Sequence, residues 1–279
     1  MSAVLDRALN ILECLAHNPA GLQLYVIAEQ LDIPRSATHR LLADLVLLGY
    51  VEQDSIAETY RLTLKVSALG QIFLSLNGVL DIAQPILDTL AENVGELVRL
   101  SIVSNERLTW VAKAQGARNG FRYDPDAGAE AHLASTSSGH AWLSTMSEEE
   151  AVRLVSRQGF GDPRQLGPHA IRTVQTLLQR LKDVRQVGYA LVVESSAPGL
   201  SAVSAPVRTR DGARVIGVLS VAGPTIRLTE NKLRDIIAPD LLAAASKLSA
   251  ASLGSAYFGG VWRLGQGTAE SHDAPQTSL

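Results

Sequence analysis

The ten residues IPRSATHRLL, positions 33–42, are the most informative stretch of the sequence. Pro34 suits the first turn of a helix, where its missing N–H is not needed. Gly49 suits the position just after a helix, because glycine adopts the left-handed conformation without strain. We therefore expect a helix from about residue 35 to residue 48, whose core-facing side consists of Ala37, Leu41, Leu45 and Leu48.

The opposite side of this predicted helix is short, cationic and rich in hydrogen-bonding groups. Its residues are Arg35, Ser36, Thr38, His39, Arg40 and Ala43, with Thr38 nearer the boundary. A recognition helix presents such positions to base edges in the major groove of DNA, where arginine suits guanine and serine or threonine can donate or accept. A solvated face on an ordinary helix is the alternative interpretation.

The flanking segments predict a small DNA-binding module. Residues 3–15 and about 26–31 have apolar side chains at helical spacing, with a turn between them at residues 17–21. Residues 50–52 and 59–62 look like two short strands joined by a polar loop, with Arg61 on the second strand. Helix, helix, turn, helix and hairpin form the outline of a winged helix-turn-helix.

Composition limits the function without identifying it. The 279 residues are 46% hydrophobic and 19% charged, with a net charge of −3. This net charge gives no indication of a nucleic-acid or membrane partner. Residues 1–80 hold five Lys/Arg and eight Asp/Glu, so attraction to DNA phosphates should be weak and binding should depend on specific contacts. Cys14 is the only cysteine, which excludes an intrachain disulfide framework and multi-cysteine zinc sites. No run of 18 apolar residues occurs, and we expect a cytoplasmic protein with no membrane partner.

The remainder of the chain predicts a mixed α+β domain. Helical spacing covers residues 64–76 and 79–94, the latter with Pro85 inside, followed by strands at 97–103 and 108–113. Further helices are expected at 147–157, 173–187 and 229–253, and further strands at 189–194, 201–207 and 215–221. The composition after Gly254 predicts a disordered tail over residues 254–279.

Several motifs in this order resemble those of the IclR-type transcriptional regulators. The segment RALNIL at residues 7–12 resembles the family's opening helix, and residues 33–42 resemble its recognition-helix motif. In the C-terminal half the resemblance continues through TSSGHAWL (136–143), VRQVGYA (184–190), SAPV (204–207) and LSVAGP (219–224). The similarity runs from about residue 4 to residue 250, and its order makes it specific.

The resemblance implies a fold, a function and an assembly. The α+β chain would divide into a winged helix-turn-helix at residues 1–62, a linker helix at 63–78 and a GAF-like effector-binding domain at 79–253. Such proteins are dimers or tetramers that bind palindromic operators near the genes they control, often genes of degradation pathways. A small organic molecule alters that binding. Repression is the more frequent mode, and activation is the alternative.

The resemblance also implies an effector site and no further cofactor. The turn Ser137-Ser138-Gly139 would hold a carboxylate with its backbone N–H groups, although plain helix capping by serine explains the same residues. The other predicted contacts are Val192, Ala202, Ser220 and Ala222. Apolar residues at 192 and 202 favour a larger effector than a two-carbon acid, such as an aromatic or aliphatic carboxylate. Trp110 and Phe121 are further candidates for the cavity wall, although packing in the core is the more common role for such residues.

The linker helix would pair two copies of the chain. Its candidate dimerisation residues are Leu64, Ala68, Ile72 and Leu76, which could instead pack inside one subunit. Two recognition helices would then read half-sites about one helical turn of DNA apart, or a multiple of that distance.

Enzyme interpretations find little support. The motifs GxSxG, HExxH and GxxxxGK[ST] are missing from the sequence, and we predict no catalytic residue. The weak alternative is hydrolytic chemistry on Ser137, Ser138 and His140. The histidines His132, His140 and His169, with Asp162 or Glu194, do not have a recognisable metal-ligand spacing, and we predict no metal.

Overall fold

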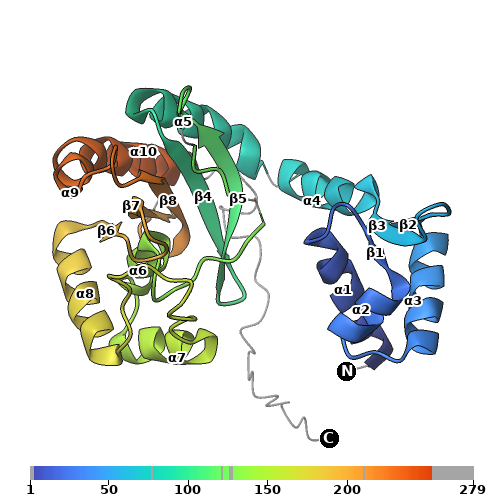
Figure 1. Cartoon of the computed structure of the whole chain (residues 1–279). Helices are drawn as coiled ribbons and strands as arrows, with labels where there is room; N and C mark the ends of the chain where they lie inside the picture. Colours follow the sequence, from blue (N-terminus) through green and yellow to red (C-terminus); the bar gives the residue numbers. More distant parts are fainter. Residues whose placement is uncertain (1–2, 77, 121, 126–127, 210, 253–279) are drawn as a thin grey trace, which may run out of the picture. The chain divides into compact units, whose positions relative to one another are not determined.

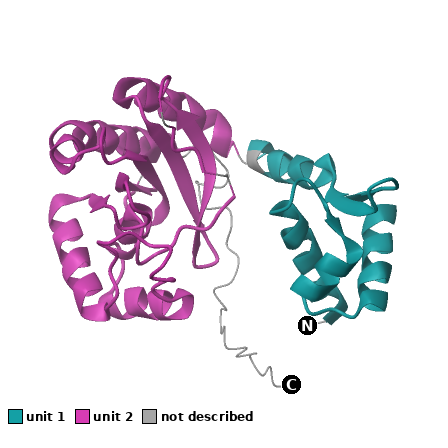
Figure 2. Ribbon diagram, viewed as in Figure 1, with its two compact units in different colours: residues 1–76 teal, residues 77–279 magenta. Residues whose placement is uncertain are grey.

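The computed structural model describes residues 3–76, 78–120, 122–125, 128–209 and 211–252. The chain forms two compact units, residues 1–76 and residues 77–279 (Figure 2). The predicted tail at 254–279 and Phe121 lie outside the described residues. Within the described ranges, no helix is long and apolar enough to cross a membrane.

The first unit holds four helices and a small antiparallel sheet in the order β1-β3-β2 (Figure 1). Its elements are α1 (Ala3–Ala16), β1 (Leu22–Gln23), α2 (Leu24–Gln30), α3 (Arg35–Leu47), β2 (Val51–Asp54), β3 (Thr59–Leu62) and α4 (Leu64–Leu76). The predicted helices and hairpin are present, while β1, which pairs with β3, is too short to have produced a strand pattern. Strands β2 and β3 form the hairpin of the wing.

The core of this unit is built by α1, α2 and α3 against the wing. Ile11, Ile27 and Leu42 are fully buried at its centre. Leu41 and Leu45 are buried as predicted, but Leu48 is 56% exposed. The helical spacing does not extend to Leu48, because α3 ends at Leu47 and Leu48 is its C-cap.

The second unit is a five-stranded antiparallel sheet, β5-β4-β8-β7-β6, with helices on both faces (Figure 1). Its strands are β4 (Leu97–Ser104), β5 (Arg107–Gln115), β6 (Ala190–Val193), β7 (Leu200–Arg208) and β8 (Val215–Pro224). Its helices are α5 (Val79–Val94), α6 (Ser137–Leu143), α7 (Glu148–Gln158), α8 (Val174–Val187), α9 (Glu230–Lys232), the π-helical turn η1 (Leu233–Ile237) and α10 (Ala238–Ala251). The predicted α+β class is confirmed, although the helix expected at 229–253 is interrupted by the π-helical turn.

The two faces of this sheet are covered by different helices. One face packs α5 and α10 against alternate strand residues such as Val98, Leu100 and Val221, which are fully buried. The other face meets the helices between β5 and β6, and there Trp110 and Val218 join a second apolar cluster. Because successive side chains alternate between faces, Arg99 and Ser101 on β4 belong to this second face. Polar groups on a buried sheet face need partners or a function, so the functional site is sought there.

Candidate functional site

The exposed side of α3 carries four of the predicted DNA-contacting residues. Arg35, Ser36, His39 and Arg40 are all exposed on one helix, and the helix has no acidic residue in its first turn. Arginine, serine and histidine side chains here are free to bond base edges or phosphates. Thus α3 has the length and the chemistry of a recognition helix.

Thr38 was predicted to contact DNA, and its placement contradicts that prediction. Its side chain is fully buried, and its hydroxyl donates to the Pro34 carbonyl oxygen at 3.2 Å. The Pro34 carbonyl, which also accepts the Thr38 N–H, thereby satisfies the buried hydroxyl, and this explains how a polar residue can lie on the core side. Thr38 is a structural residue of the helix start.

Replacing Thr38 should change the stability of the protein without changing its affinity for DNA. We expect Thr38→Val to lower the free energy of unfolding by about 1 kcal/mol, because it removes one hydrogen bond at constant volume. Operator affinity should stay within about twofold of wild type, since no exposed atom changes. Thermal denaturation and DNA titration of the same preparation measure both quantities. A large loss of DNA affinity in a fully folded variant would restore Thr38 to the interface.

The wing adds a cation that is already paired. Arg61 Nε on β3 donates to Glu52 Oε1 on β2 at 2.7 Å, and both side chains are about half exposed. An exposed pair of this kind contributes little stability, so exchange of Glu52 for a phosphate costs little. Arg61 is therefore available to a nucleic acid, but only by giving up Glu52.

The helix α4 exposes the apolar residues predicted for dimerisation. Leu64 is 84% and Leu76 is 80% exposed, and Ala68 and Ile72 are exposed as well. The start of α4 is tied to the end of α3, because Lys65 Nζ donates to the Leu48 carbonyl at 2.7 Å and lies 4.5 Å from the ring centre of Tyr50. Within the described residues of the first unit, none of these four side chains packs into the core.

A cavity of about 310 Å³ opens on the second face of the large sheet. Four predicted effector residues line it, namely Ser137, Ser138, Ala202 and Ala222, together with Trp110. Its further lining residues include Arg99, Tyr123, Glu130, His132 and Asp162. Ligand pockets of about this size are typical of small organic molecules.

Strand register explains why these residues meet. Val192 pairs with Ala202, and Ala202 pairs with Ala222, so the three form one row across β6, β7 and β8. The adjacent row contains Ser204, Ser220 and Arg99, because Ser220 pairs with both of the others. The start of α6 lies over these rows, where Ser137 Oγ is 2.6 Å and Ser138 Oγ 3.3 Å from Ser204 Oγ.

Two of the predicted effector contacts, Gly139 and Ser220, have structural roles. The Gly139 N–H donates to Thr136 Oγ1 at 3.0 Å, and a side chain at Gly139 would lie 2.3 Å from the Leu133 carbonyl oxygen. Gly139 thus allows α6 to pack on backbone and does not line the cavity. Ser220 lies on the same face of the sheet as Arg99, but it is buried, its hydroxyl donates to the Arg99 carbonyl at 3.3 Å, and it is not among the lining residues of the cavity.

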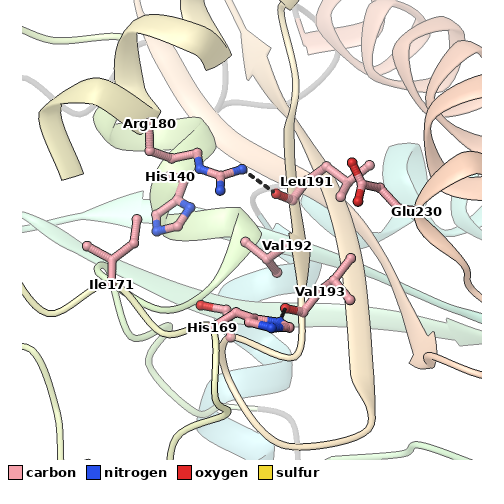
Figure 3. A pocket seen from close by; sticks show the side chains of 9 residues that line it. His140, His169, Ile171, Arg180, Leu191, Val192, Val193 and Glu230 are labelled. Carbon is pink, nitrogen blue, oxygen red and sulfur yellow. Dashed lines mark hydrogen bonds between the residues drawn. The ribbon is translucent and has the colours of Figure 1, made fainter. Parts of the chain in front are cut away.

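Val192 lines a different cavity, of about 240 Å³ (Figure 3). His140, Arg180 and Ser195 also line this second cavity. Arg180 Nη1 donates to the Leu191 carbonyl at 3.3 Å, and His169 bonds the Val193 carbonyl at 3.1 Å (Figure 3). Val192 shares a row with Ala202 and Ala222, but it lies on the edge strand β6, and this places it beside the other opening.

Arg99 is the functional candidate that the sequence did not indicate. It is 7% exposed, and its guanidinium carbon lies 3.9 Å from the ring centre of Trp110. Its Nε and Nη1 have no hydrogen-bond partner in the part of the chain that the structure describes. Burial lowers the pKa of Arg99, an effect that the phenol of Tyr123 opposes, but an arginine keeps its charge in proteins. The signal in the sequence is a charged residue within a strand whose other residues are apolar or serine.

The weak hydrolase interpretation is not supported by the geometry. Ser137 bonds Ser204, and His140 Nε2 bonds the Ala134 carbonyl at 2.9 Å, so the required serine–histidine hydrogen bond is replaced by others. The candidate metal residues are divided, since His132 and Asp162 line one cavity and His140 and His169 the other. Among the described residues, no three or more His, Cys, Asp or Glu side chains are grouped to hold a metal.

His140 gives the fold a defined pH dependence. Burial lowers the pKa of His140 to about 4, against the raising effect of its bond to Ala134. Between pH 6.5 and 4 the unfolded chain binds a proton that the folded chain excludes. Stability from His140 is therefore complete above pH 6.5, and about 3 kcal/mol of it is lost as the pH falls from 6.5 to 4.

Chemical denaturation across this pH range tests the assignment. His140→Gln should flatten the decline in the free energy of unfolding, because its amide N–H can still donate to Ala134 without titrating. His39→Gln, on the exposed side of α3, is the matched control and should leave the decline unchanged. The pKa of His132 is also lowered, mainly by burial, so a smaller decline should remain. An unaltered decline in His140→Gln would show that His140 is not its source.

Family models match most of the chain. Residues 4–55 match the IclR helix-turn-helix domain, and residues 71–250 match the bacterial transcriptional regulator IclR C-terminal domain. Among curated relatives, the HTH-type transcriptional regulator BhcR of Paracoccus denitrificans is 29% identical over 248 residues, 88% of this chain and 85% of that protein. The HTH-type transcriptional repressor AllR of Salmonella typhimurium is 28% identical over 228 residues, 82% of each chain.

Solved structures share the whole architecture. The IclR transcriptional regulator from Alicyclobacillus acidocaldarius superimposes with a TM-score of 0.77 at 25% identity, covering 90% of this chain and 98% of that one. An IclR homologue from Microbacterium hydrocarbonoxydans, complexed with 4-hydroxybenzoate, gives a TM-score of 0.70 at 20% identity over 88% and 98% of the two chains. This chain belongs to the IclR family, and it is a ligand-responsive, DNA-binding transcriptional regulator and not an enzyme.

Proposed function

We propose that this regulator is a repressor of a catabolic operon whose operator binding is changed by a small organic acid, aromatic or aliphatic, held in the 310 Å³ cavity. One observation supports the proposal that the effector is an organic acid. Four residues that the family resemblance predicts for the effector line a single cavity with the buried cation Arg99. A partly apolar cavity of this size, in which the unpaired charge among the described lining residues is a buried arginine, favours a small anion with an apolar remainder.

The DNA-binding part rests on α3 and the wing. Arg35, Ser36, His39 and Arg40 would read or anchor a half-site in the major groove, with Arg61 on the flanking backbone. Because the first unit carries few cations, affinity should come from few specific contacts, doubled in a symmetric assembly. As a DNA-binding regulator the protein would act in the cytoplasm.

The assembly is a homodimer, or a pair of dimers, on a palindromic operator. The apolar side chains of Leu64, Ala68, Ile72 and Leu76 would pair α4 with α4 of a second copy. The Lys65–Leu48 hydrogen bond would pass a change in α4 to the end of α3. The acid must therefore bind the DNA-competent and DNA-incompetent states unequally.

Repression, as distinct from activation, is favoured by the similarity to AllR, which is named a repressor. The 4-hydroxybenzoate in the Microbacterium hydrocarbonoxydans homologue supports an aromatic acid as one candidate effector. A reporter gene placed behind the upstream DNA should be expressed more strongly in cells that lack the regulator. Lower expression in those cells would make the protein an activator.

Fluorescence anisotropy on the DNA immediately upstream of the regulator's own gene tests operator binding. The titration is run with excess random competitor DNA and over a salt series. We expect tight binding that survives the competitor and has a shallow salt dependence, as few phosphate contacts require. Binding that equals competitor binding and disappears at moderate salt would contradict sequence-specific recognition.

A further inference from the structure

Arg99 is a buried cation with no counter-ion among the described residues. It is 7% exposed on the central part of the sheet, and within the described ranges two of its three guanidinium nitrogens lack a hydrogen-bond partner. Burying a charge without a partner costs several kcal/mol, and most buried polar groups in proteins are paired. The cost is explained if a ligand supplies the missing acceptors.

The guanidinium is held in place by aromatic rings. Its carbon lies 3.9 Å from the ring centre of Trp110 and 5.6 Å from that of Tyr123. The Nε1 of Trp110 is also buried without a partner, and both residues line the 310 Å³ cavity. Arg99 and Trp110 thus offer N–H donors from two side chains and no acceptor. Carboxylate oxygens are the acceptors that a guanidinium binds most strongly.

The other charged groups of the cavity are already occupied. The carboxylate of Glu130 lies 3.4 Å from Arg107 and accepts from Gln158, while that of Asp162 accepts from Arg164 at 2.7 Å. His132 Nδ1 bonds Ser135 Oγ at 2.8 Å, while its Nε2 is buried with no partner among the described residues, and burial lowers the pKa of His132 and so favours its neutral form. Arg99 is therefore the unpaired cation among the described lining residues, and a second carboxylate on a ligand would be buried without a cationic partner.

We propose that Arg99, stacked on Trp110, binds the carboxylate of the effector and restricts the cavity to small monocarboxylates with an aromatic or apolar remainder. This inference rests on the proposed effector role of the cavity. It assigns the anionic end of the ligand to β4, apart from the serine turn at the start of α6. It also makes net ligand charge the property on which selection depends.

Isothermal titration calorimetry with benzoate, phenylacetate and hexanoate is the test. Wild type should bind at least one of these acids, and Arg99→Met should bind it about 10- to 100-fold more weakly, the range that a charge-assisted hydrogen bond supplies. Phthalate, with two carboxylates, should bind wild type at least about tenfold more weakly than benzoate. Arg107→Met, which removes an exposed cation beside Glu130 at the same cavity, is the matched control and should bind benzoate within about twofold of wild type.

The stability of the unliganded variant gives an independent result. Removing an unpaired buried charge should leave the midpoint of thermal unfolding of Arg99→Met unchanged or raise it, so loss of acid binding is not due to misfolding. The amide of the same acid, such as benzamide, should lose less affinity than benzoate does in Arg99→Met, because its carbonyl oxygen is a neutral acceptor that a guanidinium binds less strongly than a carboxylate.

Three outcomes would overturn the proposal. They are wild-type benzoate affinity in Arg99→Met, equal affinity for phthalate and benzoate, and no binding of any of the three monocarboxylates to wild type. The regulator function is judged separately by the operator titration, which contains no acid. A protein that binds its operator specifically and ignores all three acids would keep the proposed DNA-binding function and lose this one.

Discussion

Gly139→Ala should lower the free energy of unfolding of the second unit by about 2–3 kcal/mol. The added Cβ would lie 2.3 Å from the carbonyl oxygen and 2.5 Å from the Cα of Leu133, and backbone atoms cannot move aside as a flexible side chain does. Either α6 or the Leu133 segment must shift. Chemical denaturation followed by the fluorescence of Trp142, which is buried on α6, measures the loss.

Gly70→Ala is the control for this substitution. Gly70 lies inside α4, and its added Cβ would meet no atom within 4 Å. Alanine there should raise the stability of the first unit by up to about 1 kcal/mol through helix propensity. If Gly139→Ala kept wild-type stability and lost only acid binding, Gly139 would be an effector contact, as the family resemblance first predicted.

Arg40→Ala should weaken specific operator binding by about 10- to 100-fold, the effect of losing one arginine–base contact of about 1–3 kcal/mol. Arg40 is exposed on α3, and its removal leaves no buried group unpaired. Acid affinity measured without DNA should not change, because the cavity belongs to the other unit. Operator anisotropy and calorimetry on the same preparation give the two affinities.

The salt dependence of Arg40→Ala distinguishes two ways of losing affinity. If Arg40 reads a base, the variant should lose discrimination between operator and random DNA while the salt slope is kept. If Arg40 binds a phosphate, affinity should fall equally on all sequences and the slope should decrease by about one. Unchanged operator affinity would remove Arg40 from the interface.

Helical periodicity predicted the DNA-binding unit well, because its helices are amphipathic and its turns contain Pro34 and Gly49. It failed at Thr38 and Leu48, the two positions near the ends of α3. A helical wheel assumes that every residue continues the helix, but Leu48 is a cap and the Thr38 hydroxyl bonds the turn residue Pro34. Local hydrogen bonds at helix ends outweigh the pattern there.

The effector cavity was only partly predictable. Ser137, Ser138, Ala202 and Ala222 line it as the resemblance implied, but that resemblance could not show that Val192 lies beside a second cavity. Arg99 was not predicted as a site residue, because an arginine in a strand normally points to solvent. Its burial depends on which segments cover that face of the sheet. The free-energy cost of burying its charge, and its role, can be recognised only from the folded structure, which brings residues distant in sequence such as Trp110 next to it.

The central claim is that acid binding in the second unit changes operator binding by the first. The most direct measurement is operator anisotropy at zero and at saturating concentration of the tightest-binding monocarboxylate. The account predicts a change in operator Kd of at least about fivefold, and an equal reciprocal change in acid affinity when operator is bound. An acid that saturates the cavity by calorimetry and leaves operator Kd unchanged would contradict it.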